Sequence, residues 1–112
     1  MNYAIVTTES FDRKIKQLAK KYRSIPDDLD VLKVELLANP KLGTDLGNNT
    51  RKVRMAITSK GRGKSGGARV ITCNIVVSVD DTDIYLLTIY DKGEQDTIPD
   101  KEIEKLKHES GL

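Results

Sequence analysis

The segment IYLLTIY, residues 84–90, constrains the fold of this chain more than any other, because it is apolar at nearly every position. Such a run, rich in β-branched and aromatic residues, is typical of a strand in the centre of a sheet. A second β-like run covers residues 68–79, and Asp80-Asp81-Thr82 between the two predicts a hairpin turn. The rest of the chain is therefore expected to supply further strands and the helices that cover this hairpin.

The N-terminal part of the chain predicts a short strand followed by an amphipathic helix. Residues 3–7, YAIVT, are apolar and rich in strand-forming residues, and Ser10 is expected to cap the helix that follows. Basic residues dominate the outer side of this helix. Its inner side is expected to carry apolar residues at helical spacing, namely Phe11, Ile15, Leu18 and Tyr22.

A second helix is predicted to start within residues 24–28. Pro26 suits its first turn, and two aspartates suit the positive end of the helix dipole. Asn39-Pro40 ends it, and the short connection to the first helix predicts an antiparallel helix hairpin. The buried stripe of this second helix is expected to consist of Leu29, Leu32, Leu36 and Leu37.

The next part of the chain predicts a strand between two loops. Residues 41–50 form a Gly/Asn-rich loop, after which apolar and cationic residues alternate along residues 52–57. This period of two indicates a strand with one apolar face and one cationic face. Residues 59–67, SKGRGKSGG, then form a loop that leads into the β-like run at residues 68–79.

A short helix around residues 99–106, with Ile103 and Leu106 facing inward, is predicted to close the chain. The element order is then β-α-α-β-β-β-α, an α+β fold in which the helix hairpin covers one face of an antiparallel-dominated sheet. A length of 112 residues suits a single domain over residues 1–112.

Positive charge is concentrated in the middle of the sequence. No acidic residue occurs between Asp45 and Asp80, so residues 46–79 carry +7 while the remainder carries −5. Such a concentration of cations among glycines favours a polyanionic partner, either a nucleic acid or an acidic protein. The seven basic residues are Arg51, Lys52, Arg54, Lys60, Arg62, Lys64 and Arg69.

The glycine loop matches the sequence patterns of nucleotide-binding motifs but not the secondary structure that these motifs require. Residues 61–66 satisfy G-x-G-x-x-G, and residues 63–65 resemble the end of a Walker A loop. Both motifs need a helix directly after the glycines to face the phosphates, whereas the residues from 68 onward predict a strand. What remains is a loop whose backbone N–H groups and cations can approach phosphates closely.

Residues that would support metal or histidine chemistry are scarce. Cys73, the single cysteine, lies in an apolar run and is expected to be buried and unreactive, and the only histidine, His108, lies in a polar stretch. No Cys/His group has metal-ligand spacing, so we expect neither a metal nor a cofactor. No apolar run reaches the roughly 20 residues of a membrane span, and no secretory signal is visible, which favours a cytoplasmic protein.

Three runs of residues resemble a known family. RKVRMAI (51–57), GRGKSGGARVI (61–71) and YLLTIYDKGEQDTI (85–98) closely resemble the HigB-like branch of the RelE/ParE superfamily of bacterial toxin–antitoxin toxins. The resemblance covers nearly the whole chain. It implies a small, cytoplasmic, metal-independent endoribonuclease that cuts messenger RNA in the ribosomal decoding site. It also implies a cognate antitoxin that neutralises the toxin in a tight complex.

The resemblance also implies site residues. The family's basic pair on the second strand falls on Lys52 and Arg54, and the arginine of its Gly-x-Arg element falls on Arg69. The basic residue after the last strand falls on Lys92.

Two positions depart from the family pattern. Gly93 stands where well-known RelE enzymes have a second C-terminal arginine, and Pro99 stands at the place of their catalytic tyrosine. Either Tyr90 and Lys92 substitute for these groups, or the protein cleaves differently or poorly.

Metal-free RNA cleavage by a 2′-hydroxyl needs a base, cations that stabilise the phosphorane, and an acid for the leaving 5′-oxygen. Lys52 is the candidate base, because repulsion from the flanking Arg51, Arg54 and Arg62 is expected to favour its neutral form. Arg54 and Arg69 are candidates for gripping the non-bridging oxygens. Tyr90 or Lys92 is the candidate acid, although a strand tyrosine can equally be a packed core residue. The residues expected to contact RNA or rRNA phosphates are Arg51, Lys60, Arg62 and Lys64.

Two other functions stay open at this point. The ParE side of the superfamily poisons gyrase without nuclease chemistry, and a decayed member would bind its antitoxin and little else. The fold alone does not decide between these functions and the nuclease.

Overall fold

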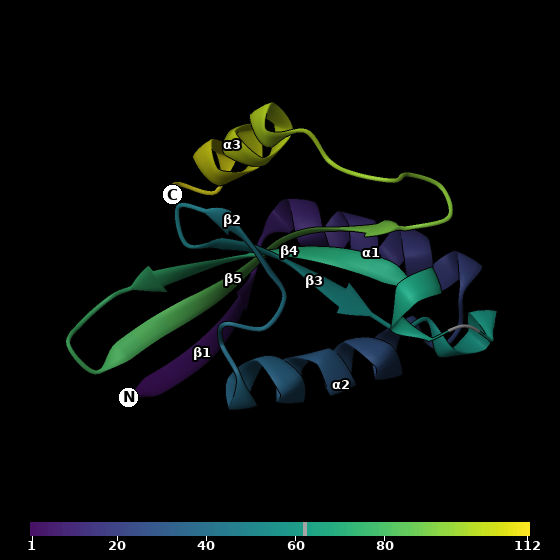
Figure 1. Cartoon of the computed structure of the whole chain (residues 1–112), viewed down its shortest axis with the longest axis horizontal. Coiled ribbons are helices and arrows are strands. Elements are labelled where there is room, and N and C mark those ends of the chain that lie inside the picture. The colour runs from purple at the N-terminus through teal and green to yellow at the C-terminus, as the bar shows by residue number, and fades with distance from the viewer. Residues whose placement is uncertain (62) are drawn as a thin grey trace.

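The computed structural model describes residues 1–61 and 63–112, which build one mixed sheet and three helices (Figure 1). Two short 3₁₀ turns, Thr58–Lys60 and Lys64–Gly66, lie in the glycine loop. The strands are β1 (Asn2–Thr7), β2 (Thr44–Gly47), β3 (Thr50–Met55), β4 (Ala68–Val76) and β5 (Asp81–Asp91), and the helices are α1 (Glu9–Lys21), α2 (Ile25–Ala38) and α3 (Asp100–Glu109).

The sheet has the order β1-β5-β4-β3-β2. Only β1 and β5 pair in parallel, and the other neighbours are antiparallel. The apolar strand β5 thus lies inside the sheet between β1 and β4. The predicted α+β fold with an antiparallel-dominated sheet is confirmed.

The structure adds one strand that the sequence did not predict, in the segment expected to be a loop. β2 pairs with β3 through Thr44 opposite Lys52 and Asp45 opposite Arg51. The turn between the two strands passes through Gly47, Asn48 and Asn49, all with φ between 52° and 88°. Glycine and asparagine tolerate this left-handed conformation, so the Gly-Asn-Asn run encodes a tight hairpin turn.

Helix α1 begins two residues earlier than predicted, because Thr8 and not Ser10 is its N-cap. The Thr8 hydroxyl accepts a hydrogen bond from the Phe11 N–H at 3.1 Å. The same hydroxyl is buried against β5 and lies 3.2 Å from the carbonyl oxygens of Leu86 and Leu87. Thr8 therefore fixes the start of the helix to the interior strand of the sheet.

The two faces of the sheet have separate cores. Helices α1 and α2 run in opposite directions over one face, and α3 lies on the side away from α2 (Figure 1). The larger core is formed by side chains from α1, α2 and four strands, among them Phe11, Leu32 and Leu86. The smaller one, below α3, includes Ile71, Leu87, Tyr90 and Ile103.

The predicted buried stripe of α2 is partly wrong. Leu32 and Leu36 are fully buried as expected, but Leu37 is 46% exposed and Leu29 is only partly buried. The stripe instead begins at Ile25 and passes through Asp28, whose carboxylate accepts hydrogen bonds from the Ser24 hydroxyl and from the Thr58 N–H. Leu37 is one helical step, about 100°, beyond Leu36 and falls outside the contact with the sheet. Through Asp28 the helix also anchors the start of the glycine loop.

In the part of the chain that the structure describes, no helix is both long enough and apolar enough to cross a membrane.

Candidate functional site

The register of β3, β4 and β5 brings basic side chains to one face of the sheet. Arg54 pairs with Arg69 across β3 and β4, and Arg69 pairs with Tyr90 across β4 and β5. Lys52 lies two residues from Arg54 and pairs with Ile71. Since directly paired residues point to the same side of a sheet, all of these side chains share the face that carries α3. Lys52 and Arg69 are therefore on the same side, opposite the helix hairpin.

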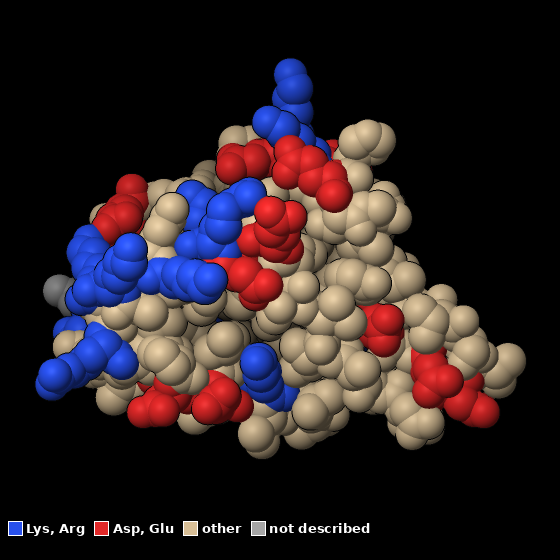
Figure 2. All heavy atoms as spheres, turned by 180° about the vertical axis from the view of Figure 1, so that it is seen from behind, with Lys and Arg blue, Asp and Glu red and all other residues tan. Residues whose placement is uncertain are grey.

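Lys52, Arg54 and Arg69 line a groove of about 400 Å³. Lys and Arg side chains gather at the end of the molecule away from the β4–β5 turn, with acidic side chains bordering them (Figure 2). Four of the five predicted catalytic residues meet in this groove. Its lining consists of Thr44, Lys52, Arg54, Arg69, Lys92, Asp96 and Thr97.

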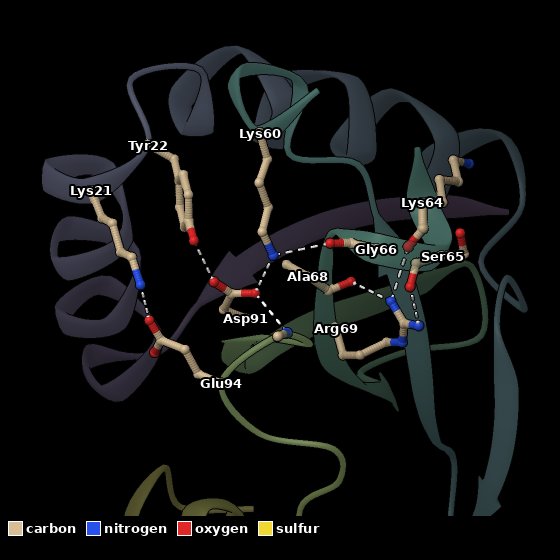
Figure 3. Close-up of polar contacts among 11 residues, drawn as sticks. Lys21, Tyr22, Lys60, Lys64, Ser65, Gly66, Ala68, Arg69, Asp91 and Glu94 are labelled. Atoms are coloured by element: carbon tan, nitrogen blue, oxygen red, sulfur yellow. Dashed lines mark hydrogen bonds and ion pairs between the residues drawn. The ribbon is translucent and has the colours of Figure 1, made fainter. Parts of the chain in front are cut away.

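Arg69 is the most deeply set cation of the groove, with 6% of its surface exposed. Its guanidinium donates hydrogen bonds to the carbonyl oxygens of Lys64 at 3.0 Å, Ser65 at 3.1 Å and Ala68 at 3.1 Å (Figure 3). Because arginine has five N–H donors, these bonds leave two for a ligand. The glycine loop thus folds back over Arg69 and holds its side chain in one orientation.

Lys52 and Arg54 are held less firmly. Neither forms an ion pair with any residue that the structure describes. Arg54 is exposed and Lys52 is partly buried on the neighbouring strand β3. Their charges therefore remain available to an anion that enters the groove.

Tyr90 lies beneath these cations and is only 7% exposed. Its ring packs in the smaller core with Ile71 and Leu87. Its hydroxyl is buried and has no hydrogen-bond partner among the described residues. Burial raises the pKa of Tyr90, the Arg69 charge opposes that rise, and the Asp96 charge adds to it. Tyr90 is therefore a core residue with an unpaired hydroxyl close to the charges of the groove.

Lys92 enters the groove from the turn after β5 and is paired there. Its ammonium group forms an ion pair with the Asp96 carboxylate, four residues later. The hydrogen bond from Lys92 and its charge lower the pKa of Asp96, and the charges of Lys52 and Arg69 contribute to the same shift. Asp96 is the one acidic group in the groove lining, and it was not among the site residues predicted from the sequence. A Lys-to-Asp spacing of four across a turn was the signal that could have found it.

The predicted phosphate contacts that the structure describes, Arg51, Lys60 and Lys64, do not join this groove. Arg51 is in phase with the buried Val53 and so points to the other face, where it donates hydrogen bonds to the carbonyl oxygens of Lys41 at 2.9 Å and Gly43 at 3.3 Å. An ion pair with Asp45 at 3.7 Å also holds it there. It therefore does not flank Lys52 as the sequence analysis expected.

Lys60 and Lys64 are also engaged within the protein. Lys64 forms an ion pair with Glu35 of α2 at 2.5 Å. Lys60 is largely buried and contacts the Asp91 carboxylate at 2.7 Å and the Gly66 carbonyl oxygen at 3.1 Å. Arg62, the fourth predicted phosphate contact, lies outside the described residues.

Asp91 connects the basic loop to the rest of the molecule. Its buried carboxylate accepts hydrogen bonds from the Tyr22 hydroxyl at 2.7 Å, the Lys60 ammonium at 2.7 Å and the Gly93 N–H at 2.8 Å (Figure 3). Burial acts to raise the pKa of Asp91, but these three hydrogen bonds and the Lys60 charge outweigh it and hold that pKa below its ordinary value. One carboxylate thus joins the end of α1, the glycine loop and the turn that carries Lys92.

The positions that depart from the family pattern supply no titratable side chain. Gly93 lies in the turn after β5, where an added Cβ would come within 3.2 Å of the Lys60 ammonium nitrogen. Pro99 is the residue that precedes α3. Among the described residues, no group of three or more His, Cys, Asp or Glu side chains is arranged to hold a metal ion.

A comparison with known protein families matches nearly the whole chain. Residues 5–111 match the family described as the RelE toxin of the RelE/RelB toxin–antitoxin system. The match extends over nearly the whole chain and includes every residue of the groove. It does not single out the HigB-like branch.

Proposed function

The chain belongs to the RelE toxin family, and on that premise we propose that this toxin of a toxin–antitoxin system is a metal-independent endoribonuclease. Its substrate is messenger RNA on the ribosome, so it inhibits translation in the cytoplasm. The whole chain, residues 1–112, acts as one toxin domain, and a cognate antitoxin neutralises it. The observation that supports this proposal most directly is the convergence of Lys52, Arg54, Arg69 and Lys92 in one groove.

The groove can bind a phosphate whose charge increases during the reaction. When the 2′-hydroxyl attacks phosphorus, the two non-bridging oxygens gain negative charge in the phosphorane. Arg69 is already oriented by three carbonyl oxygens, so its remaining donors can face those oxygens without further ordering. Arg54 is two strand positions from Lys52 and adds a second guanidinium on the same face.

Two proton transfers complete the proposed reaction. Lys52 accepts the 2′-hydroxyl proton as the general base. Tyr90 could donate a proton to the leaving 5′-oxygen only after a rearrangement that exposes its hydroxyl, which is buried and lies outside the groove lining. The products are a 2′,3′-cyclic phosphate and a free 5′-hydroxyl. Lys92 is the alternative acid and would act from the mouth of the groove.

The test of this proposal is a map of cellular messages after brief induction of the toxin. Primer extension should show cuts in translated messages, in frame with the codons. Intact messages accompanied by double-strand DNA breaks would instead support a gyrase inhibitor. Intact messages and intact DNA would leave a protein that binds its antitoxin only.

Single substitutions test the catalytic roles proposed for the groove residues in RNA cleavage. Arg54→Ala and Lys52→Ala should lower the single-turnover rate on programmed ribosomes by roughly 10²-fold, because they remove transition-state charge stabilisation and the base. Arg54 is exposed, so its loss should leave the fold intact. Lys64→Ala removes one cation outside the groove and should leave the rate at saturating ribosome nearly unchanged. Equal rates for Arg54→Ala and Lys64→Ala would contradict the assignment.

A further inference from the structure

We propose that Asp96 is an intramolecular competitor for the phosphate site, and that RNA must displace its carboxylate from Lys92 to bind. This inference rests on the proposed function, because it assumes that the groove binds phosphates. It assigns to an acidic residue of the groove a role that is neither catalytic nor structural.

Asp96 is held at the groove by the chain on both of its sides. The turn after β5 is fixed where the Asp91 carbonyl oxygen accepts hydrogen bonds from the Glu94 N–H at 3.0 Å and the Gln95 N–H at 3.1 Å. Two residues after Asp96, the Ile98 side chain is buried in the smaller core. The Asp96 carboxylate therefore cannot move far from Lys92 and competes for it at a high effective concentration.

The carboxylate is nevertheless able to leave. The Asp96 side chain is 88% exposed, whereas Lys92 is 33% exposed. Exposed ion pairs contribute little net free energy, so a rotation of the Asp96 side chain into solvent costs little. The resulting groove contains four cations and no anion among the described residues of its lining.

The chemistry of the pair explains why a phosphate can replace it. A carboxylate and a phosphodiester both carry one negative charge and accept hydrogen bonds from an ammonium group. The lowered pKa of Asp96 keeps it ionised at neutral pH, as a competitor for a cation must be. In the free protein the charge of Lys92 is thus already neutralised by Asp96. An RNA phosphate that binds Lys92 replaces the ion pair with Asp96 by an ion pair with the phosphate.

Glu94 provides a matched control for this residue. It lies on the same turn, and its carboxylate pairs with Lys21 of α1, outside the groove. Asp96→Asn and Glu94→Gln each remove one negative charge from an exposed side chain. A general electrostatic effect would therefore change both variants alike, whereas competition within the groove affects Asp96→Asn alone.

The experiment measures binding of a fluorescein-labelled 2′-O-methyl RNA oligonucleotide, which cannot be cleaved, by fluorescence anisotropy at several salt concentrations. Asp96→Asn should bind about 3- to 5-fold tighter than wild type, the range expected for loss of one weak competing ion pair. Glu94→Gln should differ from wild type by less than about 1.5-fold, because its charge is remote and screened. Freeing Lys92 should also steepen the slope of log K against log salt by about 0.7, the contribution of one further cation on single-stranded RNA.

Equal affinities for Asp96→Asn and Glu94→Gln would overturn the inference, as would weaker binding by Asp96→Asn. Absence of binding by all three forms would overturn it too, because the groove of the free protein would then not be a phosphate site. The proposed function is decided separately by the map of cleaved messages. The melting temperature of each variant confirms that it is folded.

Discussion

Replacing Asp91 by alanine should destabilise the protein more than any change at a surface ion pair. The Asp91 carboxylate is 1% exposed and accepts hydrogen bonds from Tyr22, Lys60 and Gly93. Its loss leaves the Lys60 ammonium, which is 19% exposed, without its counter-ion. Breaking a buried pair by removing one partner costs about 3–5 kcal/mol. Because Lys60 still reaches solvent and keeps its bond to the Gly66 carbonyl oxygen, we expect the lower end of that range.

A loss of about 3 kcal/mol is large compared with the stability of a domain of this size, which is typically 5–15 kcal/mol. It should lower the melting temperature by about 10–15 °C. Urea unfolding followed by circular dichroism measures it as a lower midpoint at unchanged slope. Glu94→Gln, which removes an exposed partner of Lys21, should cost less than about 1 kcal/mol in the same assay.

A double-mutant cycle identifies the source of the loss. Lys60→Met removes the unpaired ammonium, so the variant with both changes should be more stable than Asp91→Ala alone. An Asp91→Ala protein within about 1 kcal/mol of wild type would refute the reasoning. If the double variant is no more stable than Asp91→Ala, the unpaired Lys60 ammonium is not the main cause of the loss in unfolding free energy.

Three further predictions concern stability. The folded pKa of Asp91 lies below its unfolded value of about 3.9, so the stabilisation by its carboxylate is complete above that pH and is lost as the pH falls through the folded pKa. Urea unfolding across a pH series compares wild type with Asp91→Asn. The difference in their free energies of unfolding should stay constant above about pH 5 and shrink below about pH 4. Gly67→Ala places a Cβ 2.2 Å from a carbonyl oxygen of β3 and should lower the free energy of unfolding by about 1–3 kcal/mol, measured by urea unfolding. The control Gly63→Ala adds a Cβ with no atom within 4 Å and should leave the free energy of unfolding nearly unchanged. Similar losses for the two variants would contradict the steric argument. Thr8→Ala should lower the free energy of unfolding by about 1 kcal/mol and Ser10→Ala by less, and the reverse order would restore Ser10 as the cap.

Local patterns in the sequence predicted four of the five strands and all three helices, but not β2. The alternation of Val53 and Met55 with Lys52 and Arg54 is a property of neighbouring residues, and it placed the cations on one face before any register was known. The same alternation puts Arg51 with Val53 on the other face. The expectation that Arg51 flanks Lys52 was therefore avoidable.

The partners of the loop cations were not predictable in this way. Lys60 meets Asp91 31 residues later in the sequence, and Lys64 meets Glu35 29 residues earlier. Such contacts depend on how β5 and α2 pack, which no local period encodes. A run of cations without nearby acids was interpreted as a surface for phosphates, although folding supplies two of them with acidic partners from elsewhere.

The parallel pairing of β1 with β5 has a consequence for synthesis of the chain. Asn2 of β1 pairs with Asp81 of β5, 79 residues later, so β1 is synthesised well before the strand with which it pairs. At about 5–20 residues per second, this wait lasts about 4–16 s on the ribosome. During that time α1 has no β5 to cover, and neither Tyr90 nor Lys92 exists. A chain released before residue 81 lacks both the interior strand β5 and three of the seven residues that line the groove, so toxicity should arise only in finished chains.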